Sequence, residues 1–120
     1  MLTIAVTLAA GIGAVCRYGL DTWFRTRRPA IPYWGIFVVN VVGSFLVGWL
    51  VAMTASLGKE VLVVLGTGFA GGFTTLSAWA WESVALDRRG QRAAAVRYGV
   101  GSFVAGLAAV ALGFALGSLF

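Results

Sequence analysis

The sequence predicts an all-α membrane protein with four transmembrane helices. Hydrophobic residues make up 60% of the 120-residue chain and charged residues only 11%, whereas soluble domains carry about 25% charged residues to face water. The few charges also divide the chain into four long apolar stretches. A β-barrel would need many alternating segments of about ten residues, so helices are the expected spans. We expect a single transmembrane domain over residues 1–120, multi-pass in the inner (cytoplasmic) membrane.

The uncharged stretches set the positions of the four helices, because a span needs about 20 predominantly apolar residues. Uncharged runs of 30, 21 and 23 residues cover 29–58, 61–81 and 98–120. The first stretch, residues 1–16, reaches a spanning length only if its helix continues past Arg17 to Trp23. The predicted helices lie near 2–23, 32–57, 61–86 and 96–119.

The third helix contains the sharpest local feature, the segment Gly71-Gly72-Phe73-Thr74-Thr75-Leu76-Ser77. Paired glycines weaken a helix, and nearby hydroxyl groups can satisfy the backbone groups that are freed. We therefore expect the helix to be interrupted near Gly71–Thr75. An interrupted helix at the bilayer centre leaves carbonyl groups able to hold a cation. A simple kink or a close-packing site is the alternative.

Helices two and four carry isolated polar residues. Asn40 is surrounded by valines, and a polar side chain in the membrane is expected to face a partner or a polar path. An interhelical hydrogen bond without any transport role is the alternative for Asn40. In helix four, Tyr98, Ser102 and Gly106 share one face at i, i+4 and i+8, which suggests a polar track.

The basic residues predict the orientation of the chain in the membrane. The first and third loops share one side and, with the adjoining helix ends, hold eight arginines: Arg17, Arg25, Arg27, Arg28, Arg88, Arg89, Arg92 and Arg97. The other side has Lys59 alone. Cytoplasmic loops are enriched in Lys and Arg, so we expect loops one and three in the cytoplasm and both termini outside. If most arginines merely anchor helix ends, this orientation is unchanged.

Composition also excludes several classes of protein. The basic residues do not form the wetted face of a nucleic-acid binder, so no nucleic-acid partner is expected. With no His and a single Cys, disulfide frameworks and His/Cys metal sites are excluded. No nucleophile–base pair, carboxylate pair or metal cluster is present, so the chain is not expected to be an enzyme. Four short helices do not easily enclose a pathway alone, which favours an oligomer embedded in membrane lipid.

Three ordered motifs resemble those of a known family. They are Gly11-x-Gly13-Ala14-x-x-Arg17-Tyr18, Gly35-x-x-x-Val39-Asn40-x-x-Gly43-Ser44-Phe45 and Gly68-Phe69-x-Gly71-Gly72-Phe73-Thr74-Thr75-x-Ser77, with Glu82 after the last. Together they are similar to the CrcB/Fluc fluoride channel family. The resemblance implies four-helix subunits that assemble as an antiparallel dimer with two fluoride pores, which let cytoplasmic fluoride leave down its electrochemical gradient and so lower its toxicity.

The resemblance also implies roles for particular residues. The fluoride pore would include Asn40, Thr75, Ser77, Tyr98 and Ser102. Arg17 would lie near an aqueous vestibule. The backbone carbonyls of Gly71 and Thr74 would hold a structural sodium ion at the dimer interface. These residue types suit the ion, because a fluoride pore must replace tightly bound water with amide, hydroxyl and backbone N–H donors.

The chain departs from the family pattern in the pore. Two pore phenylalanines of the family correspond here to Leu76 and Trp79, a helix-two threonine to Ile36, and a common helix-four serine to Gly106. The residues expected to form the dimer scaffold thus match the family pattern more closely than those expected to line the conduction path. The imbalance of eight basic residues against one also favours insertion in one direction. An antiparallel dimer would then need a homologous partner in the opposite orientation, so a heterodimer is favoured over a homodimer.

Two other functions remain as alternatives. A small multidrug-resistance-type exporter also has four helices and forms dimers, but it would need a membrane-embedded carboxylate in helix one. Residues 1–16 contain no charged side chain. A non-conducting scaffold subunit is the second alternative, and the altered aromatic positions Leu76 and Trp79 are the reason to retain it.

Overall fold

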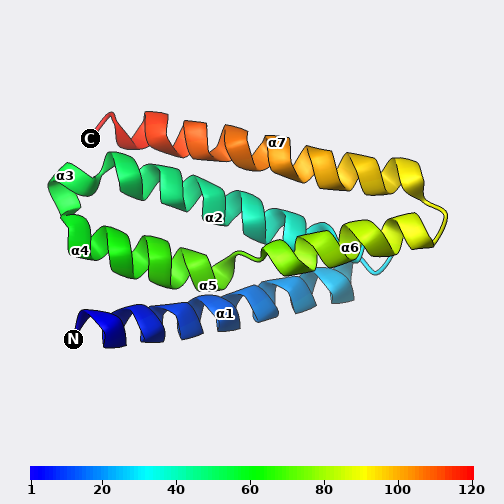
Figure 1. Ribbon diagram of the computed structural model, residues 1–120, viewed down its shortest axis with the longest axis horizontal. Helices are drawn as coiled ribbons and strands as arrows, with labels where there is room; N and C mark the ends of the chain where they lie inside the picture. Colours follow the sequence, from blue (N-terminus) through cyan, green and yellow to red (C-terminus); the bar gives the residue numbers. More distant parts are fainter.

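The computed structural model describes residues 1–120 and shows an elongated helical bundle of 48 × 29 × 22 Å. Four helical spans are long and apolar enough to cross a membrane: Leu2–Arg27, Trp34–Ala52, Lys59–Arg88 and Arg92–Gly117. The prediction of an all-α membrane protein with four spans is therefore confirmed. Both termini lie at one end of the bundle, and the α1–α2 and α6–α7 connections lie at the other (Figure 1).

The third span is made of several helical pieces, whereas the other three spans are continuous. The elements in chain order are α1 (Leu2–Arg27), α2 (Trp34–Ala52), α3 (Thr54–Leu57), α4 (Lys59–Val61), the π-helical η1 (Leu62–Ala70), α5 (Gly71–Phe73), α6 (Leu76–Arg88) and α7 (Arg92–Gly117). Helix α1 continues beyond the predicted 2–23, α2 is shorter than 32–57, and α7 begins before residue 96. Charged residues can continue a helix beyond the bilayer, so the uncharged runs mark the membrane rather than the helix ends.

Helices α2 and α7 pack together along most of their length through glycines. A Cβ atom on Gly48 would collide with the backbone of Val110, and one on Gly113 would collide with the carbonyl oxygen of Phe45. A Cβ atom on Gly117 would lie 2.9 Å from the Trp49 carbonyl oxygen. Small residues allow such close backbone contact in membranes, where no hydrophobic effect drives helices together.

Helix α1 packs in the same way against η1 and α5. A Cβ atom on Gly13 would collide with the carbonyl oxygen of Phe69, and one on Gly72 with that of Ala10. By contrast, Gly11 has no neighbour within 4 Å of its ideal Cβ position. The glycines in this part of the chain therefore differ in function, and only some hold the subunit together.

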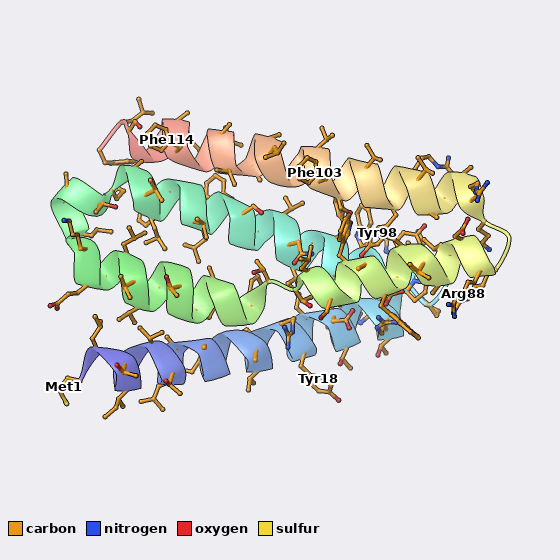
Figure 2. The ribbon with its side chains drawn as sticks, viewed as in Figure 1. Met1, Tyr18, Arg88, Tyr98, Phe103 and Phe114 are labelled. Carbon is orange, nitrogen blue, oxygen red and sulfur yellow. The ribbon has the colours of Figure 1, made fainter.

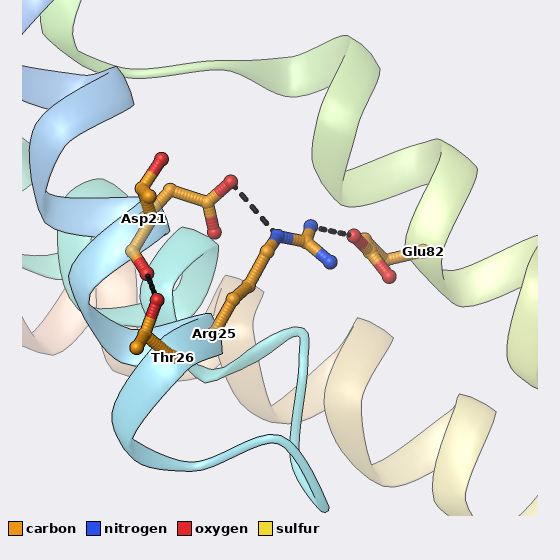
Figure 3. A network of polar contacts seen from close by, with 5 residues as sticks. Asp21, Arg25, Thr26 and Glu82 are labelled. Atoms are coloured by element: carbon orange, nitrogen blue, oxygen red, sulfur yellow. Dashed lines mark hydrogen bonds and ion pairs between the residues drawn. The ribbon is translucent and has the colours of Figure 1, made fainter.

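Charged side chains hold α1 against α6 at the end of the bundle opposite the termini. Arg25 donates to Asp21 at 3.1 Å and to Glu82 across the helix interface, as Figure 3 shows. The Glu82 side chain is only 14% exposed. A second pair, Arg92 with Asp87, is 3.2 Å long, and its arginine side chain is 85% exposed. The Arg25 network is therefore the more shielded of the two ion-pair sites.

The outer surface of the bundle is apolar. Only 17 of 120 residues are buried, and large hydrophobic side chains such as Leu8 on α1 and Phe103 on α7 are more than 60% exposed. Figure 2 shows side chains projecting outward along both helices. This surface suits lipid or another subunit and does not suit water.

Candidate functional site

The candidate site is built around the break between α5 and α6. Thr74 and Thr75 have extended backbone conformations there, with ψ angles of 159° and 117°. The Thr74 hydroxyl donates to the Ala70 carbonyl oxygen at 2.9 Å, and the Thr75 hydroxyl accepts from the Ala78 N–H at 3.2 Å. The two hydroxyls thus satisfy the helix ends on either side of the break. Gly71 and Gly72 remain helical, so the break falls at the threonines.

Asn40 on α2 binds the broken segment with both ends of its amide. Its Nδ2 donates to the Thr75 carbonyl oxygen at 3.0 Å, and its Oδ1 accepts from the Thr75 N–H at 2.9 Å. The interhelical hydrogen bond that the sequence left open is therefore present. An amide has two N–H donors, so one Asn40 donor is left for another acceptor.

The bond from Thr75 to Asn40 takes a helical partner away from the Gly71 carbonyl in α5. In a continuous helix the Thr75 N–H would bond to the Gly71 carbonyl, but here it bonds to Asn40. The Gly71 and Thr74 carbonyls accept none of the backbone bonds made outside the regular helices. Gly71 is exposed, and only the Gly66 oxygen, at 3.9 Å, lies near its ideal Cβ position. Oxygen ligands of this kind suit a hard cation, so these residues fit a sodium ion.

A groove of about 390 Å³ runs between α2, α6 and α7 beside the break. Its lining has no charged side chain and comprises Asn40, Gly43, Ser44, Val47, Thr74, Thr75, Leu76, Trp79, Ser102, Phe103, Gly106, Leu107 and Val110. The groove thus brings together three predicted pore residues (Asn40, Thr75 and Ser102) and the two altered aromatic positions. Their side chains present amide and hydroxyl groups between apolar walls.

The other predicted pore and vestibule residues lie outside this groove. The Ser77 hydroxyl is 3.2 Å from that of Thr75. Tyr98 is buried in a cluster that Trp79 packs against, and its ring centroid is 4.8 Å from that of Tyr33; Figure 2 labels its position on α7. Arg17 is partly exposed on α1 and does not line the groove.

Ser44 and Phe103 are among the groove residues that were not identified as site residues from the sequence. Ser44 follows Asn40 by one helical turn, and this i, i+4 spacing was the available signal for a shared face. Its hydroxyl lies 3.5 Å from the ideal Cβ position of Gly106. Phe103 follows Ser102 directly, but no periodic pattern distinguishes it from the other apolar residues of α7.

Several polar atoms of the subunit are shielded from solvent without a hydrogen-bond partner. They are the Trp79 indole nitrogen and the Ser102 hydroxyl, whose residues line the groove, and the Tyr98 hydroxyl and one carboxylate oxygen of Asp21, whose residues do not. Such atoms are uncommon in proteins, because a buried polar group without a partner costs about 1–3 kcal/mol. Three of the four lie on α6 and α7, where these helices meet.

The sequence is similar to known proteins over nearly its whole length. The family described as CrcB-like protein, Camphor Resistance (CrcB), matches residues 4–114. The chain is 40% identical over 121 residues to the fluoride-specific ion channel FluC 1 of Leifsonia xyli, covering 99% of this chain and 88% of that protein. It is 41% identical over 122 residues to the fluoride-specific ion channel FluC of Agrobacterium fabrum, covering 98% of this chain and 97% of that protein. The corresponding protein of Chloroflexus aurantiacus is 40% identical over 121 residues, covering 98% of this chain and 95% of that protein.

Proposed function

This chain belongs to the CrcB-like protein family, and from that membership we propose that it is a subunit of a fluoride-specific ion channel. The observation that carries the proposal is the full-length similarity to relatives with this activity. The groove supports it, because amide and hydroxyl groups from α2, α6 and α7 converge there without any charged side chain. A multidrug exporter finds no such support, since no carboxylate lines the groove.

The groove offers what a fluoride ion needs when it sheds its water. Fluoride is small and strongly hydrated, so a pore must replace its water with donors such as the free Asn40 N–H and the Ser102 hydroxyl. Neutral donors bind an anion without the trapping strength of a full positive charge. The apolar walls exclude water, which strengthens each of these polar interactions.

The direction of transport follows from acid–base chemistry and the membrane potential. Hydrogen fluoride is neutral, crosses membranes and ionises in a less acidic cytoplasm, where fluoride accumulates. A passive pore then lets the anion leave, assisted by a negative-inside potential worth about 2.3 kcal/mol per charge per 100 mV. The channel would therefore lower intracellular fluoride without ATP or a coupled proton.

We further propose that two subunits assemble in antiparallel orientation in the inner membrane. The subunit encloses the groove only in part, and a second subunit would supply a further wall. Gly71 is exposed and Thr74 is half-buried, and in this assembly their carbonyls and those of the second subunit would hold a structural sodium ion. Sodium would neutralise facing carbonyl dipoles at the centre of the dimer and so fix the two subunits together.

A heterodimer is favoured by the distribution of charge. Eight arginines belong to one side of the membrane by sequence and only Lys59 to the other, so most copies would insert with the termini outside. Without Arg17 and Arg97, which lie within α1 and α7, the ratio is still six to one. An antiparallel assembly would then need a homologous chain of opposite bias. The altered pore positions Leu76 and Trp79 also favour a heterodimer, since a dimer of two different chains can lose lining residues in one pore while the other pore retains them.

Growth of a fluoride-sensitive bacterium tests the proposed function. A strain without its own fluoride exporter should grow in fluoride at mildly acidic pH when it expresses this chain with any co-encoded homologue. An Asn40→Ala chain should fail to restore growth at equal membrane expression. A scaffold subunit without conduction would instead leave fluoride tolerance unchanged, although the protein reaches the membrane.

A further inference from the structure

A second pocket, of about 290 Å³, lies between the start of α2 and the first half of α7. We call it the α2–α7 pocket. It shares no lining residue with the groove beside the helix break. Four of its seven lining residues are aromatic, and Arg97 is the only charged one. Among these rings, Trp34 and Phe37 stack with their centroids 5.0 Å apart. The pocket therefore joins one guanidinium group to an aromatic wall.

Arg97 has no acidic partner within the subunit. The chain has four acidic residues, and the three at the arginine-rich end are engaged by two other arginines. Asp21 and Glu82 pair with Arg25, and Asp87 pairs with Arg92. None of the three ion pairs includes Arg97. A charged side chain within a membrane span is costly without a partner, so its positive charge calls for an anion from outside the subunit.

The α2–α7 pocket lies where a membrane meets water. Arg97 is five residues beyond Arg92, the first residue of α7, which is about 7.5 Å along the helix. Trp34 is the first residue of α2 and is 38% exposed. Tyr and Trp are enriched at membrane–water interfaces, and an arginine side chain can extend along apolar surface to reach them. The pocket is thus placed at the depth of phospholipid headgroups.

An open apolar surface continues from Arg97 toward the middle of α7. Gly101 and Val104 follow Arg97 at i+4 and i+7, so they lie on the same helix face. Gly101 lines the pocket and has no neighbour within 4 Å of its ideal Cβ position, and Val104 is 57% exposed. This arrangement matches a molecule that has an anionic head and a hydrocarbon chain. A free phosphate ion would leave the apolar part unused.

We propose that the α2–α7 pocket binds the headgroup of an anionic phospholipid, such as phosphatidylglycerol, in the leaflet at the arginine-rich end. Arg97 donates to the phosphate oxygens, whose geometry suits a guanidinium fork, and one acyl chain lies over Gly101. Basic pockets between membrane helices bind anionic headgroups. Phosphatidylcholine suits the site less well, because its ammonium group is attracted by the rings but repelled by Arg97. The proposed site is separate from the fluoride path.

Native mass spectrometry of the purified protein, titrated with phosphatidylglycerol or phosphatidylcholine, tests the charge requirement. We expect saturable binding of one phosphatidylglycerol per subunit and weaker binding of phosphatidylcholine. Arg97→Gln should weaken phosphatidylglycerol binding by about tenfold, the loss of one hydrogen bond between charged groups. Arg89→Gln is the matched control, because Arg89 is exposed at the same end and lies outside the pocket. Equal affinities for the two lipids, or equal losses in the two variants, would overturn the proposal.

Filling the pocket provides a second test that leaves every charge in place. Gly101→Leu should abolish the preference for phosphatidylglycerol without unfolding the subunit, because its Cβ position is open. Gly19→Leu is the control, since that position is equally open but lies on α1. Unchanged lipid binding by Gly101→Leu would overturn the site. Glycerol phosphate at millimolar concentration should not displace the lipid, and displacement would indicate a site for free phosphate in its place.

Discussion

Asn40 joins the two properties of this site, a broken helix and a polar groove. Both of its amide atoms bond to Thr75, and its side chain lines the groove. The sequence presented these roles as alternatives, an interhelical bond or a place on the ion path. The geometry makes them compatible, because the amide fixes the broken segment and still has one N–H to donate. One residue can therefore set the pore's shape and contribute to its lining.

Replacing Asn40 with Ala should damage both stability and transport. Thr75 would lose partners for its N–H and its carbonyl, and each unsatisfied group costs about 1–3 kcal/mol. We expect a lower thermal midpoint in detergent and loss of fluoride efflux. Ser44→Ala is the control, since Ser44 lines the same groove but does not bond to Thr75, whose N–H and carbonyl pair with Asn40. Equal thermal midpoints for the two variants would show that the Asn40 bonds do not hold the break.

Gly71 and Gly72 are neighbours whose substitution should have different effects. Gly72→Ala should weaken the subunit itself, because the added Cβ collides with the carbonyl oxygen of Ala10. Gly71→Val should leave the subunit folded, because the space around its Cβ position is open. It should nevertheless impair dimer assembly, since the Gly71 carbonyl belongs to the proposed sodium site.

Thermal unfolding and chemical cross-linking of the two variants separate these effects. We expect Gly72→Ala to lower the unfolding temperature and Gly71→Val to lower the dimer fraction. Thr74→Ser should be mild in both measurements, because its carbonyl and its hydroxyl are retained. If Gly71→Val and Thr74→Ser are tolerated equally well, the break is a kink without a cation.

At the scale of elements, the third span shows what the sequence could and could not predict. The glycine pair and the hydroxyls predicted an interruption near Gly71–Thr75, and the break lies at Thr74 and Thr75. Its exact place depends on Asn40, which is 35 residues away in the chain. The π-helical stretch Leu62–Ala70 was not predicted, because Gly66-Thr67-Gly68 can weaken a helix but does not specify a π-helical hydrogen-bond pattern. Tertiary contact with α1 competes with local propensity there.

The Arg25 network should contribute to the packing of α1 against α6. Arg25→Gln would leave the mostly buried Glu82 carboxylate without its charged partner, so we expect a loss of about 1–3 kcal/mol of stability. Adding Glu82→Gln should recover part of this loss, and thermal unfolding of the single and double variants measures the coupling. Arg92→Gln removes a more exposed pair and should change stability by less than about 0.5 kcal/mol. Equal effects of Arg25→Gln and Arg92→Gln would contradict a supporting role for the network.

At the scale of the whole molecule, the four spans follow directly from the distribution of charge along the chain. Uncharged runs longer than about 20 residues are sufficient for that prediction. Which glycines mediate close contacts was less predictable, since a Cβ atom on Gly113 would collide with α2 whereas one on Gly101 would have no neighbour within 4 Å. The groove brings together residues from α2, α6 and α7, and neither its lining nor its unpaired donors can be derived from periodicity within one helix.

The orientation of the chain can be measured by labelling cysteines in cells. In a Cys16→Ser background, Ser118→Cys places a thiol just beyond α7, and Gln91→Cys places one at the opposite end. A membrane-impermeant maleimide should label Ser118→Cys and leave Gln91→Cys unlabelled, because the arginine-rich end stays in the cytoplasm. Replacing Arg27, Arg28, Arg88 and Arg89 with Gln should produce mixed labelling. Mixed labelling of the variants that retain all their arginines would remove the argument for a heterodimer.

Fluoride efflux from liposomes tests the channel function most directly. Vesicles loaded with potassium fluoride would contain this chain alone, or this chain with a co-encoded homologue, and valinomycin would carry the compensating potassium. We expect a fluoride electrode to detect rapid release of fluoride when both chains are present. Vesicles loaded with potassium chloride should retain their chloride. Release by this chain alone would favour a homodimer and still support the channel. Retention of fluoride in every preparation, with both proteins inserted, would contradict the proposal that this chain is a fluoride channel subunit.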